Sequence, residues 1–453
     1  MILKETLLSS RLINKVSGDL SEDYTGVSID TRSMAPGDIF VAIQGESFDG
    51  ADFLDIAIAK KASLIILSTS SKKKMTNKIP IIFVENTINY LQAIAKDHLA
   101  LWKTKKNNLT IGITGSNGKT TQKEMLFHIL NSIFPEKIHK TIGNYNNHIG
   151  VPLTLLKLEE KHTVSIIEMG SNHPGEIKFL SDIVSPDAGL ITNIGLAHLE
   201  FFKDLDGVFD EKSSLFNAVK EKKHAKFVIC DDDPYLSKLA PHEILTSFGE
   251  NSLDIKVKLY DSSLLIDFNQ NTIEISNKYI FGKNNLKNLA QVLLLAIKLF
   301  PDKQSELTQA CSSFIPSQNR GEIIQKDGKI FFLDAYNANP SSMLHSMESF
   351  IDYLSSRKAK IDCCLFILGD MNEIGNQTEK MHAEIGEWAR TQKIKNIIFV
   401  GKYAQFYKGS SWNAPIIYDS VDELSKEKDK LLHSFDYFFL KGSRTIQLEK
   451  FVL

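Results

Sequence analysis

A glycine-rich segment between a strand pattern and a helix pattern constrains the fold of this chain more than any other feature. Residues 109–113 alternate apolar positions as a half-buried strand does. Apolar residues at positions 125, 126, 129, 130 and 133 then share one face of a helix. Between the two patterns, Gly115 and Gly118 allow a sharp turn and a close approach of the backbone to phosphate oxygens. Because a helix N-terminus favours negative charge, we expect a phosphate-binding loop at this junction.

The loop also offers side chains suited to a nucleoside triphosphate. We expect Lys119 to reach the terminal phosphates and the Thr120 hydroxyl to bind Mg²⁺. The strict pattern G-x-x-x-x-G-K-[ST] is incomplete, since Ile113 stands where its first glycine belongs. A glycine-rich turn without a ligand is the alternative. The predicted nucleotide-binding residues of the loop are Gly115, Ser116, Asn117, Gly118, Lys119, Thr120 and Thr121.

Composition excludes several classes of protein. The net charge of −2 gives no electrostatic case for binding nucleic acid or an anionic membrane. No apolar run reaches the roughly 18 residues that a membrane span needs, and the first residues lack the apolar stretch of a signal peptide. The four cysteines form no C-x-x-C pair, so we expect reduced thiols in a cytoplasmic protein, with Cys363 and Cys364 in the core of a strand.

The order of the patterns predicts three α/β domains, in agreement with a length of 453 residues. We expect a small N-terminal α/β domain at 1–104 and a central domain at 105–316. The central sheet should be mostly parallel around the phosphate loop, with antiparallel strands appended at 255–281. A Rossmann-like α/β domain should occupy 317–453. Strands are expected at 37–43, 63–67, 109–113, 164–169, 188–194, 226–230, 364–368, 396–400 and 436–440.

Two polar residues follow the next strands of the expected central sheet. Glu168 ends one strand and His198 lies beyond another. Ligands of doubly wound sheets bind at the carboxyl ends of the strands, so we expect both to face the phosphate loop and Glu168 to bind Mg²⁺. The alternatives are a capping or solvent-facing acid and an ordinary core or surface histidine.

Several segments together resemble one family. The phosphate loop resembles the Mur ligases, the ATP-dependent amide-forming enzymes of bacterial cell-wall precursor synthesis. The other segments that carry this resemblance are Gly143-Asn-Tyr-Asn-Asn-His148, Glu168-Met-Gly170 and Asn193-Ile-Gly-Leu-Ala-His198. Further segments resemble the branch that adds D-alanyl-D-alanine, and these are Asp30-Thr-Arg-Ser-Met-Ala-Pro-Gly-Asp-Ile-Phe-Val-Ala42, Asp334-Ala-Tyr-Asn-Ala-Asn-Pro340, Leu368-Gly-Asp-Met-Asn-Glu-Ile-Gly375 and Lys441-Gly-Ser-Arg444.

The resemblance implies a monomeric ligase that joins D-alanyl-D-alanine to UDP-N-acetylmuramoyl-tripeptide through an acyl phosphate. It implies ATP and Mg²⁺ as cofactors, with Mn²⁺ as an alternative, and no nucleic-acid partner. In the family a second metal ion is held by a histidine and a carbamylated lysine, and Lys212 stands at that lysine's position. The implied catalytic residues are Lys119, His198 and Lys212, and the implied metal ligands are Thr120, Glu168, His198 and Lys212. A charged helix face is the alternative for Lys212.

The resemblance also implies residues that contact the nucleotide and the substrates. This chain departs from the family at Asn284, where histidine is usual, and at Leu333, where many relatives have a first aspartate. The implied nucleotide contacts outside the loop are Asn285, Asn288, Arg320 and Asp334. The implied substrate contacts are Thr31, Ser47, Asp49, Asn144, Asn146, Asn147, Tyr336 and Asn337. The segment around Tyr336 could instead be a simple turn, because Asn and Pro favour turns without any ligand.

Three other functions compete. A relative that adds diaminopimelate or lysine typically carries an Asp-Asn-Pro-Arg segment, and this chain has none. Folylpolyglutamate synthase shares the loop but lacks the N-terminal uridine-type domain. A non-catalytic regulator that uses ATP as a switch would not need Lys119, Glu168, His198 and Lys212 together.

Overall fold

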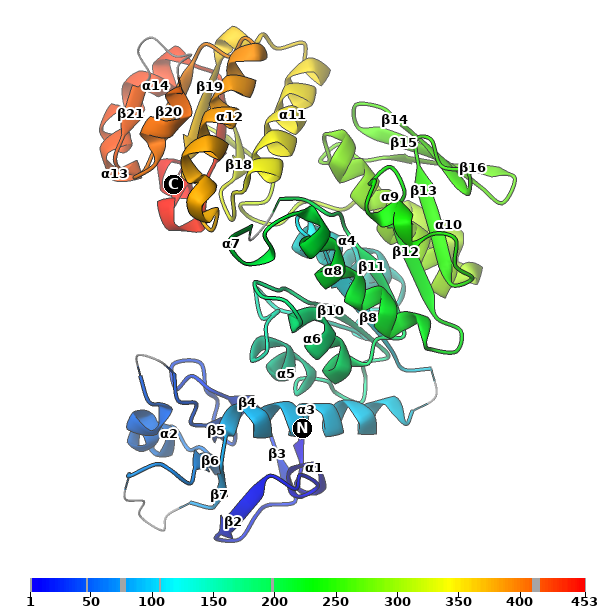
Figure 1. Cartoon of the computed structure of the whole chain (residues 1–453), viewed down its shortest axis with the longest axis vertical. Coiled ribbons are helices and arrows are strands. Elements are labelled where there is room, and N and C mark those ends of the chain that lie inside the picture. Colours follow the sequence, from blue (N-terminus) through cyan, green and yellow to red (C-terminus); the bar gives the residue numbers. More distant parts are fainter. Residues whose placement is uncertain are drawn as a thin grey trace.

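Three α/β regions follow one another along the long axis of the molecule (Figure 1). The computed structural model describes residues 2–45, 48–73, 79–105, 107–196, 199–409 and 416–452. The N-terminal region lies at one end, the phosphate loop in the middle region, and the C-terminal region at the other end. Within these described ranges, no helix is long and apolar enough to cross a membrane. The three-domain α/β fold predicted from the sequence is therefore confirmed.

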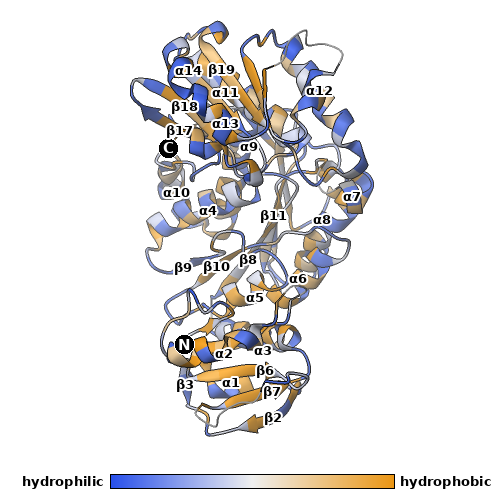
Figure 2. Cartoon of the chain, turned by 90° about the vertical axis from the view of Figure 1, so that its left-hand side faces the viewer, coloured by the Kyte–Doolittle hydropathy of each residue, from blue (hydrophilic) through white to orange (hydrophobic). Residues whose placement is uncertain are grey.

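The N-terminal region is built on a five-stranded sheet with the order β2-β7-β6-β5-β4. Four strands are parallel, and β2 pairs antiparallel with β7. Figure 2 shows β6 and β7 of this sheet as hydrophobic strands, and both are almost entirely buried, as expected for strands covered on both faces. The strands are β2 (Ile13–Ser17), β4 (Val27–Ser28), β5 (Ile39–Val41), β6 (Leu64–Ser68) and β7 (Ile81–Val84), with the small pair β1 (Ile2–Leu3) and β3 (Asp23–Tyr24), and the helices are α1 (Lys4–Leu8), η1 (Gly50–Phe53) and α2 (Leu54–Ala59).

Helix α3 (Thr87–Lys103) joins the N-terminal region to the central one. The Asn86 side chain caps it by accepting from the backbone N–H groups of Ile88 and Asn89. One continuous apolar cluster runs from the N-terminal strands through α3 to the central region. On the central side, Trp102 Nε1 donates to the His162 carbonyl at 3.1 Å, and Lys103 pairs with Asp187 at 2.8 Å. The predicted boundary at residue 104 thus follows a helix that belongs to both cores.

The central region holds a nine-stranded sheet with the order β16-β15-β14-β13-β12-β11-β8-β10-β9. It is parallel from β9 to β14, and β15 and β16 are antiparallel, which confirms the predicted mixed sheet. The strands are β8 (Leu109–Thr114), β9 (Ile138–Lys140), β10 (Val164–Glu168), β11 (Ala188–Ile191), β12 (Lys226–Cys230), β13 (Leu245–Gly249), β14 (Ile255–Leu259), β15 (Ser263–Phe268) and β16 (Asn271–Ser276). The strand expected at 188–194 ends earlier, at Ile191, because the chain turns there toward the phosphate loop.

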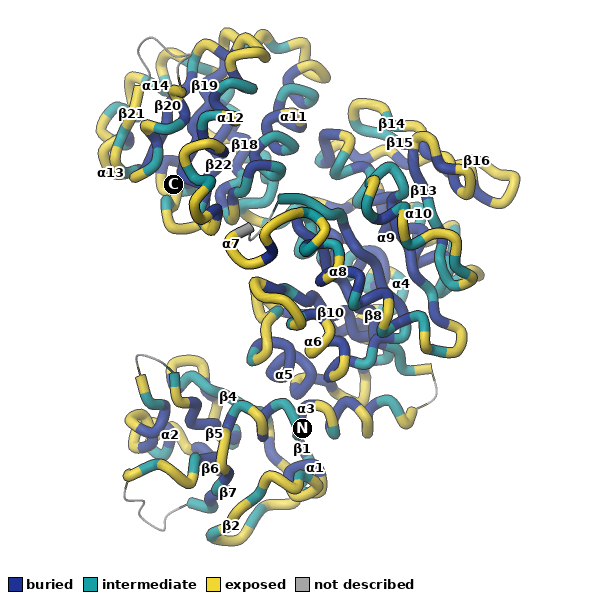
Figure 3. The backbone as a smooth tube through the Cα atoms, in the orientation of Figure 1, coloured by how far each residue is buried: buried dark blue, intermediate teal, exposed yellow. Residues whose placement is uncertain are grey.

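Helices cover both faces of this sheet. Successive strand residues point to opposite faces, so Ile166 and Ile167 of β10 belong to different apolar clusters. Figure 3 shows the buried strands between partly exposed helices. One face carries α5 (Gly150–Leu155), α6 (Glu176–Val184) and α8 (Leu205–Lys220), the other carries α4 (Lys119–Ile133), α9 (Lys283–Leu299) and α10 (Gln304–Cys311), and the short elements are α7 (Leu199–Phe202), η2 (Leu236–Leu239) and η3 (Pro301–Lys303).

The C-terminal region has a six-stranded sheet with the order β17-β18-β22-β19-β20-β21. Only the edge hairpin β17–β18 is antiparallel. The strands are β17 (Glu322–Lys326), β18 (Lys329–Asp334), β19 (Cys364–Gly369), β20 (Ile397–Val400), β21 (Ile416–Tyr418) and β22 (Tyr437–Lys441), and the main helices are α11 (Pro340–Ser356), α12 (Thr378–Thr391), α13 (Val421–Leu424) and α14 (Lys428–Ser434). Cys364 is buried in β19 as expected, but Cys363 is exposed in the turn η4 (Ile361–Cys363), so the prediction of strand core is wrong for Cys363.

Candidate active site

The phosphate loop turns from β8 into α4 with a conformation that only glycine fits. Gly115 has a φ of +141°, and a Cβ there would lie 1.9 Å from Thr192 Oγ1. Gly118 has a φ of +80° at the N-terminus of α4. The positive φ of both glycines confirms the predicted sharp turn, and the close approach to phosphate oxygens stays a prediction.

The loop is held against the segment that follows β11. The hydroxyl of Ser116 donates to the Gly195 carbonyl at 3.0 Å and accepts from the Gly195 N–H at 2.9 Å. The Asn117 N–H donates to Asn193 Oδ1, and Asn193 Nδ2 donates back to the Asn117 carbonyl, both at 3.1 Å. These reciprocal bonds fix the loop at the carboxyl edge of the sheet, where doubly wound proteins bind ligands.

Lys119 folds back over the loop that precedes it. Its Nζ donates to the carbonyl oxygens of Gly115 at 2.7 Å and Ser116 at 3.0 Å. Burial lowers the pKa of Lys119, and the nearby carboxylate of Glu168 opposes that shift. The amine of Lys119 therefore lies within the phosphate loop, at the N-terminus of α4. Contact between Lys119 and terminal phosphates stays a prediction.

Glu168 lies at the end of β10 and is 2% exposed. Its carboxylate accepts from the Thr120 hydroxyl at 3.0 and 3.1 Å and from Asn146 Nδ2 at 2.9 Å. The capping and solvent-facing alternatives for Glu168 are therefore wrong. The residues present fit Mg²⁺, because a hydroxyl and a carboxylate are the hard oxygen donors it prefers. Among the described residues, no group of three or more His, Cys, Asp and Glu is arranged to hold a metal ion.

Lys123 is a site residue that the sequence reasoning missed. Its side chain is fully buried, and Nζ lies 3.5 Å from the Glu168 carboxylate and 3.2 Å from that of Glu124. A signal was present, since position 123 is one helical turn beyond Lys119 and faces the same side of α4. A lysine there is a second cation next to the candidate metal ligand.

Lys212 is buried on α8 with 1% of its surface exposed, so the alternative of an exposed charged face is wrong. Its Nζ donates to Ser171 Oγ at 2.6 Å. Burial, aided by the positive charge of Lys119, lowers the pKa of Lys212 to about 7. Its neighbour Glu211 has a different role, because its carboxylate accepts from the N–H groups of Gly175 and Ile177 at the start of α6.

Two residues predicted for the site, Ser47 and His198, lie outside the described residues. Thr31 and Asp49 lie in the N-terminal region. Thr31 is nearly buried. Asp49 caps η1 by accepting from the Ala51 N–H and lines a hollow that includes Lys72.

A pocket at the junction of the central and C-terminal regions brings together three of the predicted nucleotide contacts. Thr121, Asn285 and Arg320 line it. Phe281 and Phe332 supply apolar walls. The guanidinium of Arg320 stacks 3.8 Å from the centre of the Tyr336 ring.

Asn288, also predicted to contact the nucleotide, faces α4. Its Oδ1 accepts from Gln122 Nε2 at 2.7 Å, and the same amide nitrogen donates to Gln291 Oε1 at 2.8 Å. Gln291 Nε2 in turn donates to the carbonyl oxygens of Ile191 and Val228. This buried amide chain ties α4 and α9 to the ends of the central strands.

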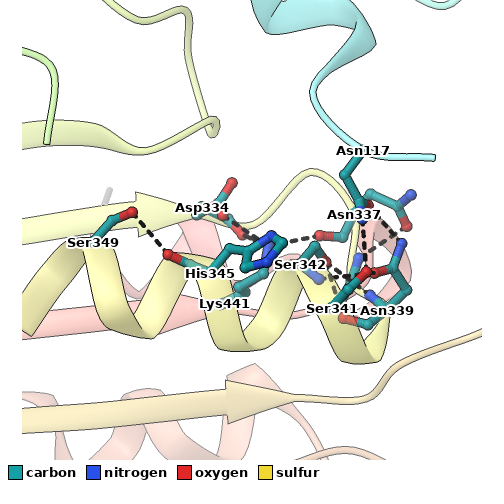
Figure 4. A network of polar contacts seen from close by, with 10 residues as sticks. Asn117, Asp334, Asn337, Asn339, Ser341, Ser342, His345, Ser349 and Lys441 are labelled. Carbon is teal, nitrogen blue, oxygen red and sulfur yellow. Dashed lines mark hydrogen bonds and ion pairs between the residues drawn. The ribbon is translucent and has the colours of Figure 1, made fainter. Parts of the chain in front are cut away.

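Asp334 ends β18 and pairs with a lysine from the neighbouring strand. Lys441 Nζ donates to Asp334 Oδ2 at 2.7 Å and to the Asn337 carbonyl at 3.0 Å. Lys441 is 1% exposed, whereas Asn337 is exposed. Figure 4 shows this pair beside the first turn of α11. The Lys441 segment was noted in the sequence, but its link to Asp334 depends on the parallel pairing of β18 and β22.

The asparagines between β9 and α5 divide into two groups. Asn146 faces Glu168 through its side chain and accepts from the Gly170 N–H through its carbonyl. Asn144 and Asn147 are exposed, and Asn147 Oδ1 accepts from the Gly150 N–H at the start of α5. The structure thus brings Asn146 to the candidate metal ligand and leaves the other two on the surface of the loop.

Comparison with known families gives three matches in succession. The family model described as the Mur ligase family catalytic domain matches residues 23–111, and the Mur ligase middle domain matches residues 113–296. The Mur ligase glutamate ligase domain matches residues 319–444. These matches cover most of the chain.

Curated relatives extend the similarity over nearly full lengths. UDP-N-acetylmuramoyl-tripeptide–D-alanyl-D-alanine ligase of Bacillus subtilis is 31% identical over 438 residues, which cover 94% of this chain and 92% of that protein. The ligase of the same name from Haemophilus influenzae is 32% identical over 401 residues, covering 85% and 82% of the two chains.

Solved structures share the arrangement of the three regions. A crystal structure of MurF from Acinetobacter baumannii superposes with a TM-score of 0.86 at 24% identity, covering all of this chain and 98% of that one. A structure of MurF ligase from Thermotoga maritima in complex with ADP has a TM-score of 0.78 at 25% identity, covering 94% and 96%.

Proposed function

This chain belongs to the Mur ligase family, and we propose that it joins D-alanyl-D-alanine to UDP-N-acetylmuramoyl-tripeptide with cleavage of ATP to ADP and phosphate. The observation that carries the proposal is structural. The central region holds the phosphate loop, Glu168 and Lys212, and the C-terminal region contacts that loop. The ADP complex of the Thermotoga maritima relative supports ATP as the nucleotide.

The proposed reaction has two steps. A carboxylate oxygen of the tripeptide attacks the γ-phosphorus of ATP, the bond to the bridging oxygen breaks, and ADP leaves. The free amine of D-alanyl-D-alanine then attacks the acyl carbon of the resulting acyl phosphate. The tetrahedral intermediate expels phosphate and loses a proton from nitrogen, which leaves the new amide. Positioning and electrostatic stabilisation dominate such a phosphoryl transfer.

The residues of the phosphate loop supply that stabilisation. Lys119 places its charge where the terminal phosphates of a nucleotide on this loop would lie. Thr120 and Glu168 would hold Mg²⁺, or Mn²⁺, which would neutralise charge on the phosphate oxygens. Asn146 orients the Glu168 carboxylate and ties it to the loop that would face the tripeptide.

Lys212 is proposed to react with CO₂ and become a carbamate. Only the neutral amine attacks CO₂, and a pKa lowered to about 7 makes that form abundant near neutral pH. The amine nitrogen bonds to carbon and loses its proton to solvent, so a buried cation becomes an anion with two oxygen acceptors. A carbamate carbon signal in ¹³C NMR with ¹³C-bicarbonate tests this idea, and the signal should vanish in Lys212→Ala. Short carboxylic acids should partly restore the activity of that variant, and a wild-type protein without the signal would contradict carbamylation.

The two large substrates are assigned to different regions. The N-terminal region would hold the uridine nucleotide near Asp49, and the central region would hold ATP in the pocket with Asn285 and Arg320. We therefore expect no competition between ATP and the UDP precursor. The enzyme is proposed to act as a cytoplasmic monomer, which sedimentation and cell fractionation would test.

A single assay separates the ligase from a nucleotide switch. Incubation with ATP, Mg²⁺ and both substrates should yield ADP, phosphate and the UDP-linked pentapeptide in equal amounts. Omission of D-alanyl-D-alanine should stop steady ADP production. If ADP accumulates equally fast without the dipeptide, the protein is not this ligase.

A further inference from the structure

The phosphate loop contacts the C-terminal region through a closed set of three side chains, Asn117, Asn339 and Ser341, here called the clasp (Figure 4). Asn339 Nδ2 donates to Asn117 Oδ1 at 2.7 Å, and Asn117 Nδ2 donates to Ser341 Oγ at 2.7 Å. Ser341 Oγ donates to Asn339 Oδ1 at 3.0 Å, which closes the ring. The first two bonds join residues more than two hundred positions apart, so both the oxygen and the nitrogen of the Asn117 side-chain amide bond to the C-terminal region.

Asn339 has a second task on its own helix. It is the N-cap of α11, with its Oδ1 accepting from the Ser342 N–H at 2.9 Å, and Ser342 completes a capping box. The side-chain oxygen of Asn339 caps the helix and also accepts from Ser341, whereas the nitrogen makes the bond to the phosphate loop. The division allows the two tasks to be separated by substitution.

A second contact fixes α11 to the central region at another point. The rings of Phe281 and Tyr353 meet edge to face with centroids 4.8 Å apart. Gly282 packs so closely on Ser349 that a Cβ there would lie 2.1 Å from its Oγ. The middle of α11 is therefore held by apolar packing beside the start of α9, and its N-terminus is held by the polar clasp.

We propose that Asn339 is a positioning residue. Through its bond to Asn117, it sets the orientation of the C-terminal region relative to the phosphate loop. The apolar contact at Phe281 provides the pivot, and the clasp selects one rotation about it. The segment immediately before Asn339 carries Tyr336, stacked under Arg320, and Asn337, whose carbonyl binds Lys441. Fixing Asn339 on the loop therefore fixes these groups relative to the transferring phosphoryl group. The inference rests on the proposed function for its activity readout only.

The matched variants are Asn339→Ser and Ser342→Ala. Serine caps a helix about as well as asparagine, so Asn339→Ser keeps the cap and removes the nitrogen that reaches Asn117. Ser342→Ala weakens the capping box and leaves the clasp intact, because Ser342 makes its bonds only within the first turn of α11. Thermal melting of both proteins provides the check on folding.

The relative orientation of the central and C-terminal regions can be measured without any substrate, as the distance between two dyes. Cys363 is exposed in the C-terminal region, and the other three cysteines are buried, so one added cysteine at the exposed Lys223 of the central region gives a dye pair. We expect a narrow distribution of single-molecule energy transfer for the parent and for Ser342→Ala. Asn339→Ser should broaden the distribution or shift it.

Kinetics provides the second readout. Asn339→Ser should lower kcat about tenfold or more, since small misplacements of reacting groups are costly. Adding Asn339→Ser to Asn117→Ala should cost no more than Asn117→Ala alone, because Asn117→Ala already removes the bond that Asn339→Ser removes. Unchanged energy transfer in Asn339→Ser, or an equal effect of Ser342→Ala, would overturn the proposal. A parent enzyme that fails to ligate D-alanyl-D-alanine would overturn the proposed function alone, since the energy-transfer result stands without it.

Discussion

The ammonium group of Lys123 lies 3.5 Å from the carboxylate of Glu168, and both side chains are removed from solvent. Opposite charges in such surroundings stabilise each other. Lys123 has a second partner in Glu124 at 3.2 Å, and Glu168 also accepts from Thr120 and Asn146. The pair lies one helical turn from the loop that would bind phosphate. Lys123 therefore both neutralises the buried Glu168 carboxylate and adds positive charge near that loop.

Replacing Lys123 with methionine should destabilise the protein by about 3 kcal/mol or more, as expected for a buried pair that loses one partner. Urea unfolding followed by circular dichroism measures the change. Adding Glu168→Gln should recover part of the loss, because the carboxylate then no longer needs a cation. A loss below about 1 kcal/mol for Lys123→Met would contradict this interpretation.

Lys119→Ala should abolish ligation while the protein remains folded. The lysine bonds only to loop carbonyl oxygens among the contacts found here, whereas its charge would act on the transferring phosphoryl group, so kcat should fall on the order of 10²-fold or more. Steady-state phosphate release gives the rate, and thermal melting gives the fold. A folded variant with the parent's rate would exclude a catalytic role for Lys119.

Lys212 should make stability depend on pH in a defined direction. Its pKa is about 7 in the folded protein and 10.5 as the ordinary value. Between these values the unfolded chain holds a proton that the folded protein has released, so the free energy of unfolding rises with pH, by at most about 1.4 kcal/mol per unit. Below pH 7 both forms are protonated, and the cost of burying the ammonium is fully present.

The test compares the parent with Lys212→Met in buffers free of CO₂. The difference in unfolding free energy between the two proteins should grow in favour of the parent from pH 7 to about 10. Parallel pH profiles of the two proteins would show that Lys212 keeps an ordinary pKa.

We expect that the N-terminal region can be removed without destabilising the rest of the protein only if the remaining fragment keeps helix α3. A fragment of residues 86–453 should bind ADP and lose affinity for the UDP precursor. A fragment of residues 105–453 should melt at a lower temperature, because it lacks the bonds of Trp102 and Lys103 to the central region. Calorimetric titration with ADP and with the UDP precursor measures both affinities, and precursor binding by 86–453 equal to that of the full chain would contradict the domain assignment.

Much of the fold follows from periodicity and the order of the elements. The strands around residues 111, 166 and 228 are buried on both faces, which gives apolar runs that are easy to recognise. Strands β1, β2, β3, β4, β7, β9, β13, β17, β18 and β21 were not predicted. Of these, β2, β9 and β17 are partly polar, and the pairing of β2 with β7 joins segments far apart in the chain. The apolar runs of β7 and β18 are too short for periodicity to identify as strands.

The candidate site was predictable where one short segment supplies the chemistry, as in the phosphate loop. It was less predictable where a bond joins distant segments. The sequence Asn339-Pro340 is a typical helix start, with a capping residue followed by proline, but nothing local indicates that its free amide nitrogen meets Asn117. The burial of Lys123 was hidden for the same reason, since Glu168 and Gly143 approach it from other elements.

Helix α3 has a consequence for the choice of substrate. One apolar cluster continues through α3 from the N-terminal sheet to the central one, so packing in the described residues connects the region where a uridine nucleotide would bind to the region that carries the phosphate loop. For a long substrate anchored at its nucleotide end, the distance between the two binding places would then determine which substrate length can react. A peptide stem one residue too short would leave its carboxylate short of the phosphate, however tightly the nucleotide is held.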